Sequence, residues 1–197
     1  VDRAAIADEL GAAVADAFTR PDPGGATGRP AGPGTFDGER LDRSARIDSA
    51  LAILEEAGYQ AASVRAFEIL VSEADPLRVA AANAIAERIT ELGLEVTVTR
   101  LSPDELADRV LPPIRFDRAA SWDMAVLGWR PTGPDPGDLL IHLFRSDEDS
   151  VTGGGINVTG FRSPAFDELI SRYLATTDFD RGGAILDQME LMLSAEV

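Results

Sequence analysis

The chain of 197 residues contains no cysteine and a single histidine, His142. The lack of cysteine excludes a thiol nucleophile, a disulfide framework and zinc ligated by cysteine. One histidine leaves little room for a histidine-based metal site or a Ser-His-Asp triad. Because His142 lies in an apolar run, we expect it to be a packed or surface residue and not a metal ligand.

Basic residues and long apolar runs are also scarce. The chain has 18 Lys and Arg against 34 Asp and Glu, which gives a formal net charge of −16. Phosphate-binding surfaces need clustered Lys and Arg, so this balance argues against nucleic acid and an anionic membrane surface. No apolar run reaches the roughly 18 residues of a membrane span, and no signal peptide is visible. Since the chain begins at Val1 and not at methionine, we expect a processed product or part of a longer protein.

Hydrophobic residues make up 45% of the chain, enough for a packed core, and their spacing predicts an α/β fold. A strand over 64–71, a helix opened by Asp75 and a strand over 94–99 indicate a βαβ crossover with parallel strands. Ser102 and Glu105 form a capping box that opens a short helix. Other elements are expected as a strand over 122–129 and helices over 47–57, 139–144, 164–173 and from about 180. The Pro- and Gly-rich stretch 21–40 is predicted to be a loop within one domain that spans residues 1–197.

An acidic cluster raises the question of catalysis. Its members are Asp135, Asp138, Asp147, Glu148 and Asp149. Two carboxylates with separated pKa values can carry out glycoside hydrolysis, so a hydrolase is one hypothesis. A solvated acidic surface is the interpretation that the net charge favours, and with it we expect no catalytic residue. A stand-alone domain that binds a protein partner is a further alternative.

The segment after the predicted strand 122–129 carries the best candidates for a ligand site. In open α/β sheets, ligands bind beyond the carboxyl ends of the strands. Trp129 offers a rigid apolar face with an indole N–H donor. Arg130 has a planar guanidinium that can donate two hydrogen bonds to a carboxylate. Thr132 and Asp135 add polar anchors in this proline-rich loop. The alternative is that Trp129 fills the core and Arg130 is a surface cation.

Seven motifs follow one another along nearly the whole chain. In order they are VDR-x-x-I from Val1, a Pro- and Gly-rich stretch, LEEAGY from Leu54, LGLEVTV from Leu92, FDRAASWDMAVLGW followed by PDP, N-x-x-G-F-x-S-P-x-F-D-E-L-I from Asn157, and a closing helix after TTDFDR. Their order resembles the later part of the family 5 extracellular solute-binding proteins. These are the peptide, dipeptide and nickel receptors of ABC importers.

The resemblance implies a lobe of a type II periplasmic-binding-protein-like fold, with a mixed sheet flanked by helices. It also implies that residues 1–197 form a C-terminal lobe fragment and that a missing N-terminal lobe closes over a small-molecule or peptide ligand. The implied function is the substrate-binding component of an ABC importer, with permease subunits as partners and no catalysis, cofactor or metal. The implied location is extracytoplasmic, in the periplasm or at the cell surface, with a lipid anchor on the full-length protein.

The resemblance extends to single residues only in places. Trp129 matches the family's GW tryptophan beside the ligand pocket, and the loop after it matches too. Oligopeptide and dipeptide receptors have an aspartate for the peptide's free amine where this chain has Thr132, so an ordinary peptide is not the expected ligand. Arg130 indicates an anionic or carboxylate-bearing group instead, and Asp135 is a candidate to replace the missing aspartate. Asn157 matches a family position and is a candidate ligand contact, with a structural role in the lobe as the alternative.

Overall fold

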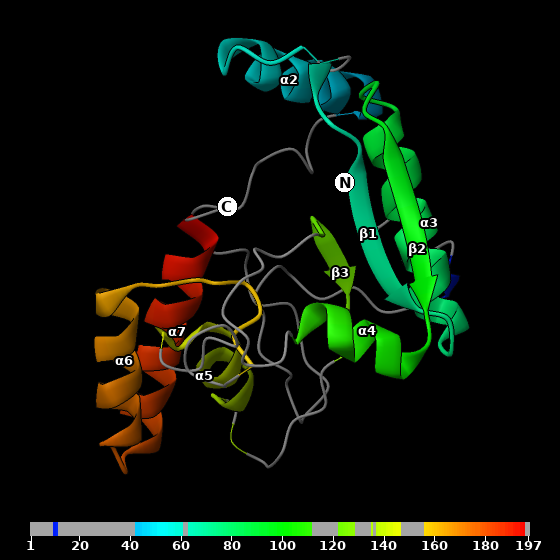
Figure 1. Ribbon diagram of the computed structural model, residues 1–197. Coiled ribbons are helices and arrows are strands. Elements are labelled where there is room, and N and C mark those ends of the chain that lie inside the picture. The colour runs from blue at the N-terminus through cyan, green and yellow to red at the C-terminus, as the bar shows by residue number, and fades with distance from the viewer. Residues whose placement is uncertain are drawn as a thin grey trace. The chain divides into compact units, whose positions relative to one another are not determined.

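Helices and parallel strands alternate in the first part of the chain that the structure describes (Figure 1). This computed structural model describes residues 10–11, 42–60, 63–111, 122–128, 135, 137–146 and 156–195. They fall into two compact units, one holding the described residues up to 110 together with 122–128, and the other holding Leu111 and the described residues from 135 to 195. The predicted loop 21–40 and the candidate residues Trp129, Arg130 and Thr132 lie outside the described residues.

The first unit is built on a three-stranded sheet. β1 (Phe67–Ser72) lies in the centre, between β2 (Val96–Leu101) and β3 (Met124–Val126). α3 (Pro76–Thr90) connects β1 to β2, which confirms the predicted βαβ crossover. The resemblance implied a mixed sheet, of which the described residues show two parallel strand pairs.

The limits of β1 and β2 differ from the predicted ranges 64–71 and 94–99. Both strands begin and end later, because Phe67 pairs with Val96 and Ser72 pairs with Leu101. A strand extends as far as its neighbour offers hydrogen-bond partners, and this register is not visible in either segment alone. Leu94 precedes β2 and is still buried in the core of the unit.

α2 (Arg43–Glu56) begins four residues before the predicted helix 47–57. The reason is a cap, since the Asp42 side chain accepts a hydrogen bond of 2.9 Å from the backbone N–H of Ala45. Leu51, in the middle of this helix, is exposed, and no residue of α2 is buried.

The next two helices begin as predicted. The Asp75 side chain accepts a hydrogen bond of 3.1 Å from the backbone N–H of Arg78, and a proline follows at the first helical position of α3. α4 (Pro103–Val110) opens with the capping box, in which the Ser102 N–H donates to Glu105 and the Glu105 N–H donates to the Ser102 hydroxyl. Such local pairs are what a sequence pattern specifies directly.

The core of the first unit is centred on β1. Successive strand residues face opposite sides of a sheet, so Ile69 and Val71 pack on the α3 side and Leu70 faces away from it. The buried residues on the α3 side are Ile69, Val71, Ala82, Ile89 and Leu94. α4 contacts β1 and β2 and lies near the carboxyl ends of the strands (Figure 1). β1 is therefore buried on both faces, which its run of apolar residues allows.

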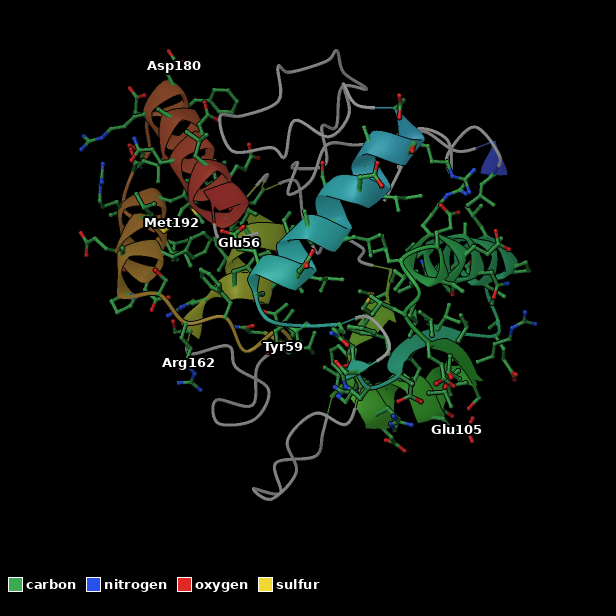
Figure 2. All side chains as sticks on the ribbon, turned by 90° about the horizontal axis from the view of Figure 1, so that it is seen from above. Glu56, Tyr59, Glu105, Arg162, Asp180 and Met192 are labelled. Atoms are coloured by element: carbon green, nitrogen blue, oxygen red, sulfur yellow. The ribbon has the colours of Figure 1, made fainter. Side chains whose placement is uncertain are left out.

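The second unit is helical. α5 (Asp138–Phe144), α6 (Pro164–Leu174) and α7 (Phe179–Ala195) confirm the predicted helices over 139–144, 164–173 and from about 180. Figure 2 labels Asp180 near the start and Met192 near the end of α7. The fully enclosed core residues are Leu140, Phe166, Ile170, Ile185, Leu186 and Met189. The Phe166 ring meets Phe144 and Phe161 edge to face, with centroids 6.3 and 5.4 Å away, a favoured aromatic geometry.

Among the helices that the structure describes, none combines the length and the apolar character that crossing a membrane requires.

Asp123 attaches the start of β3 to β1. Its carboxylate accepts 2.9 Å hydrogen bonds from the Glu68 backbone N–H and from the Arg65 guanidinium. Its own N–H donates to the Glu68 carbonyl oxygen at 3.2 Å. The Glu68 N–H and then the Arg65 guanidinium hold the pKa of Asp123 below its ordinary value of 3.8, because both favour the ionised carboxylate.

We expect Asp123→Asn to lower the free energy of unfolding at pH 7 by about 1 kcal/mol, because an amide replaces the charged acceptor. A depressed pKa stabilises the fold above the unfolded value, and this stabilisation is lost as the pH falls through the folded value. The difference between variant and parent should therefore shrink below pH 3.8. Urea denaturation at pH 7 and pH 3 measures it. Asp48→Asn, on an exposed position of α2, is the matched control and should change little.

Candidate functional site

The start of the candidate loop lies at the carboxyl edge of the sheet. β3 ends at Val126, and Gly128 directly precedes Trp129. α3 follows β1, which is parallel to β3, so the first turn of α3 lies at this same edge. Arg78 in that turn packs against Gly128, where a Cβ would overlap with the Arg78 guanidinium. A side chain at position 128 would therefore require the Arg78 guanidinium, the far end of a flexible and partly exposed side chain, to move aside.

Asp75 orients Arg78 at this edge. The Asp75 carboxylate caps α3 and also lies 3.2 Å from Nε of Arg78. The same carboxylate thus caps the helix and pairs with the guanidinium. Because both side chains are partly exposed, this ion pair contributes little stability.

The end of the loop is held in the second unit. Oδ1 of Asp135 accepts hydrogen bonds from the Gly137 N–H at 2.7 Å and from the Tyr173 hydroxyl at 2.6 Å. The Asp135 carbonyl oxygen accepts from the Asp138 N–H at 3.2 Å. Asp135 therefore forms an Asx turn that leads into α5, and Tyr173 of α6 fixes the position of its carboxylate.

Gly137 is required by the tyrosine ring. A Cβ at this position would lie 2.7 Å from Cε1 of Tyr173 and 3.2 Å from Oδ1 of Asp135. Real Cβ atoms do not approach this closely, so an alanine would displace the ring or the turn. Both ends of the loop thus pair a glycine with a large side chain from a distant part of the sequence.

Asn157 lies inside the second unit, with 1% of its surface exposed. Its Nδ2 donates to the carbonyl oxygens of Phe161 at 2.8 Å and Arg145 at 3.2 Å. Its Oδ1 accepts from the Thr159 hydroxyl at 2.7 Å. An amide has two donors and one carbonyl oxygen, and each of these groups has a partner within the protein. These contacts tie the chain before α6 to the end of α5, so they fit the alternative of a structural role.

The acidic cluster is only partly described. Asp138 is buried in the first turn of α5, and its Oδ1 lies 3.4 Å from Nε2 of His142. His142 therefore has an acidic neighbour one turn away. Residues 147–149 lie outside the described part of the chain. Within that part, no three His, Asp or Glu side chains gather in a way that could hold a metal ion.

A shallow groove of about 380 Å³ lies along α3 in the first unit. It is lined by Glu73, Pro76, Val79, Ala80, Asn83 and Arg100. The sequence analysis gave none of these residues a role in ligand binding. It also did not connect Arg78 with Gly128 or Tyr173 with Gly137.

A model of the bacterial extracellular solute-binding proteins, family 5 (middle region), matches residues 1–150 of the chain. The chain belongs to this family. The match confirms the resemblance that the ordered motifs indicated. No curated protein matches the chain.

Solved structures share the family fold. The murein tripeptide binding protein MppA of Escherichia coli has a TM-score of 0.73 at 18% identity, over 99% of this chain and 35% of its own. OppA of Haemophilus influenzae, in complex with RPPGFSPFR, has a TM-score of 0.64 at 20% identity, over 82% of this chain and 29% of its own. NikZ of Campylobacter jejuni, in complex with Ni(L-His), has a TM-score of 0.62 at 19% identity, over 76% of this chain and 30% of its own. The chain thus spans about a third of these proteins, and its α/β fold is that of a lobe of a type II periplasmic binding protein.

Proposed function

We propose that the chain is the C-terminal lobe of the substrate-binding component of an ABC importer. The observation that carries this proposal is the family match over residues 1–150. The missing part of the protein would supply the N-terminal lobe, and residues 1–197 would form a single α/β lobe. Permease subunits would receive the solute, and the protein would act outside the cytoplasm with a lipid anchor. Affinity would come from burial of the solute between the lobes and from a few placed polar groups.

The proposed solute carries an acidic group. Arg130 is our candidate for binding a carboxylate or other anion, because a planar guanidinium can donate two parallel hydrogen bonds. Thr132 has only a neutral hydroxyl, so a free amine gains no ion pair there. Trp129 would supply an apolar wall, and Asp135 a carboxylate whose position is set by Gly137 and Tyr173.

The relatives define the candidate solutes. The solved relatives are a murein tripeptide binding protein, a complex with the peptide RPPGFSPFR and a complex with Ni(L-His). A peptide-like solute with an extra carboxylate fits Arg130 and Thr132 better than an ordinary peptide does. For Asn157 we favour a structural role in the lobe over a contact with the solute, because its amide is enclosed and bonded within the protein.

A ligand screen on the complete two-lobed protein tests this proposal. The panel contains the murein tripeptide, RPPGFSPFR with free and with acetylated amino terminus, and Ni(L-His). By mass action, a bound solute stabilises the folded protein by about 2.7 kcal/mol when the free ligand concentration is 100 times Kd. The melting temperature rises as a result. We expect the murein tripeptide to give the largest shift and acetylation of RPPGFSPFR to have little effect. If no member of the panel changes the melting temperature, the proposal of a peptide-like solute is wrong.

A further inference from the structure

The strand order places a change of direction in the middle of the first unit's sheet. The chain runs from β1 through α3 to β2 on one side of β1, and then returns past β1 to form β3 on the other side. Both strand pairs are parallel, so β1 and β3 end at the same edge of the sheet (Figure 1). In open α/β sheets, ligands bind outside the carboxyl ends of the two strands between which the chain changes direction. In this unit those strands are β1 and β3.

A cation lies at this point of the edge. Arg78 belongs to the first turn of α3, which follows β1, and its guanidinium occupies the space beside Gly128, which follows β3. Its side chain is 41% exposed, so a solute can reach it. Leu77 and Leu127, which precede Arg78 and Gly128 in the sequence, are also exposed. The cation is thus accompanied by apolar side chains that a bound solute could cover.

The terminal nitrogens of Arg78 are available for a further partner. The Asp75 carboxylate contacts Nε at 3.2 Å, and within the part of the chain that the structure describes neither Nη1 nor Nη2 forms a hydrogen bond. Other arginines of this unit use Nη1 or Nη2 to bond a carboxylate of the protein; they are Arg43, Arg65, Arg88 and Arg109. A guanidinium can hold a second carboxylate end-on through Nη1 and Nη2 while Nε stays paired.

We propose that Arg78 is a binding residue for a carboxylate of the solute, with Nη1 and Nη2 donating to its two oxygens. Because the side chain is long and partly exposed, the guanidinium can turn toward the solute without any movement of the backbone. The assignment rests on the proposed function and narrows its substrate class to acids with a free carboxylate. It gives the candidate Arg130 a second cation, one whose place in the fold is known.

Arg100 is the matched comparison at the same edge. It lies near the carboxyl end of β2, is exposed, and lines the groove along α3. β2 is not one of the two strands between which the chain changes direction. If exposure alone decided which arginine binds a solute, Arg100 would serve as well as Arg78, so the two residues separate the proposal from a general effect of surface charge.

Arginine modification tests the proposal without any solute. Phenylglyoxal reacts with Nη1 and Nη2 of a guanidinium, and peptide mapping by mass spectrometry gives the rate at each arginine of the complete protein. We expect Arg78 to react faster than Arg109, whose Nη2 bonds Glu68 at 2.8 Å and whose Nε is buried. Acetate, the simplest carboxylate, should slow the reaction of Arg78 relative to chloride at equal ionic strength. The expected slowing is about twofold when the acetate concentration equals its dissociation constant. Arg100 should show no saturable protection.

Matched peptides test the role in solute binding. Calorimetry compares the murein tripeptide and RPPGFSPFR, each with free and with amidated carboxyl groups, on the complete parent protein, Arg78→Gln and Arg100→Gln. We expect Arg78→Gln to weaken binding of the free acids about tenfold or more, because charge-assisted hydrogen bonds are lost, and to change binding of the amides little. Arg78→Lys keeps the charge without the planar fork and should lose less. Arg100→Gln should bind like the parent.

The proposal is overturned if Arg78 reacts as slowly as Arg109 or if acetate does not protect it. It is also overturned if Arg78→Gln weakens the free acids and the amides equally, because the residue would then act through the fold. If the peptides bind and Arg78→Gln leaves every dissociation constant unchanged, solute binding holds and Arg78 is not a contact. If acetate protects Arg78 and neither peptide binds the parent, the peptide-like solute is wrong and the carboxylate site stands.

Discussion

Replacing Asn157 by alanine should lower the free energy of unfolding of the second unit by about 2–3 kcal/mol. The variant removes two donated hydrogen bonds and one accepted bond from a side chain that is 1% exposed. Each buried bond contributes about 1 kcal/mol, and the carbonyl oxygens left without a partner add to the loss. Urea denaturation followed by circular dichroism measures the change.

Asn157→Asp distinguishes the contribution of the two hydrogen bonds that Nδ2 donates from that of the bond that Oδ1 accepts. A carboxylate keeps an oxygen for the Thr159 hydroxyl but faces the carbonyl oxygens of Phe161 and Arg145, so we expect it to destabilise at least as much as alanine. Thr159→Val removes a single bond of the same group and should cost about 1 kcal/mol. If Asn157→Ala instead left stability unchanged and weakened solute binding, the residue would be a ligand contact.

Replacing Trp129 by alanine should weaken solute binding by the complete protein at least about tenfold, which corresponds to 1.4 kcal/mol. Large aromatic anchors supply a disproportionate share of binding energy, because they bury much apolar surface at a low entropic cost. Isothermal titration calorimetry with the solute found in the screen measures the dissociation constant.

Trp122 is the matched control for this variant. Its indole donates to the Arg109 backbone within the first unit, so Trp122→Ala should reduce stability and leave the affinity of the folded protein unchanged. The opposite pattern, an unchanged dissociation constant in Trp129→Ala, would contradict a role in binding. Trp129 would then be a packing residue, which is the alternative that the sequence left open.

Patterns confined to a few neighbouring residues were predictable. Asp75 with its following proline, and Ser102 with Glu105, define helix starts because donor and acceptor lie within one turn. The limits of the strands were not predictable in this way, because the ends of β1 depend on where β2 pairs with it. The cap at Asp42 was overlooked, although an aspartate before a helix is a local signal.

In the candidate site too, local features were predictable from the sequence and contacts between distant residues were not. The sequence picked out Asp135 as a polar residue in a proline-rich loop, but its partner Tyr173 lies 38 residues away. Likewise, nothing near Gly128 in the sequence indicates that Arg78 packs on it. For Asn157, a family position suggested a ligand contact, and only the fold reveals that its amide is enclosed. The role of a side chain whose partners are distant in sequence can be assigned only once the fold shows which residues it contacts.

The central place of β1 has a consequence for synthesis. Glu68 in this strand is bonded to Thr99 and to Asp123, which lie 31 and 55 residues further along the chain. At roughly 5–20 residues per second on the ribosome, about 3 to 11 seconds pass before the second neighbour has even been made. During this interval the most buried strand that the structure describes has an unoccupied edge. A holding chaperone would therefore have its longest opportunity on this segment.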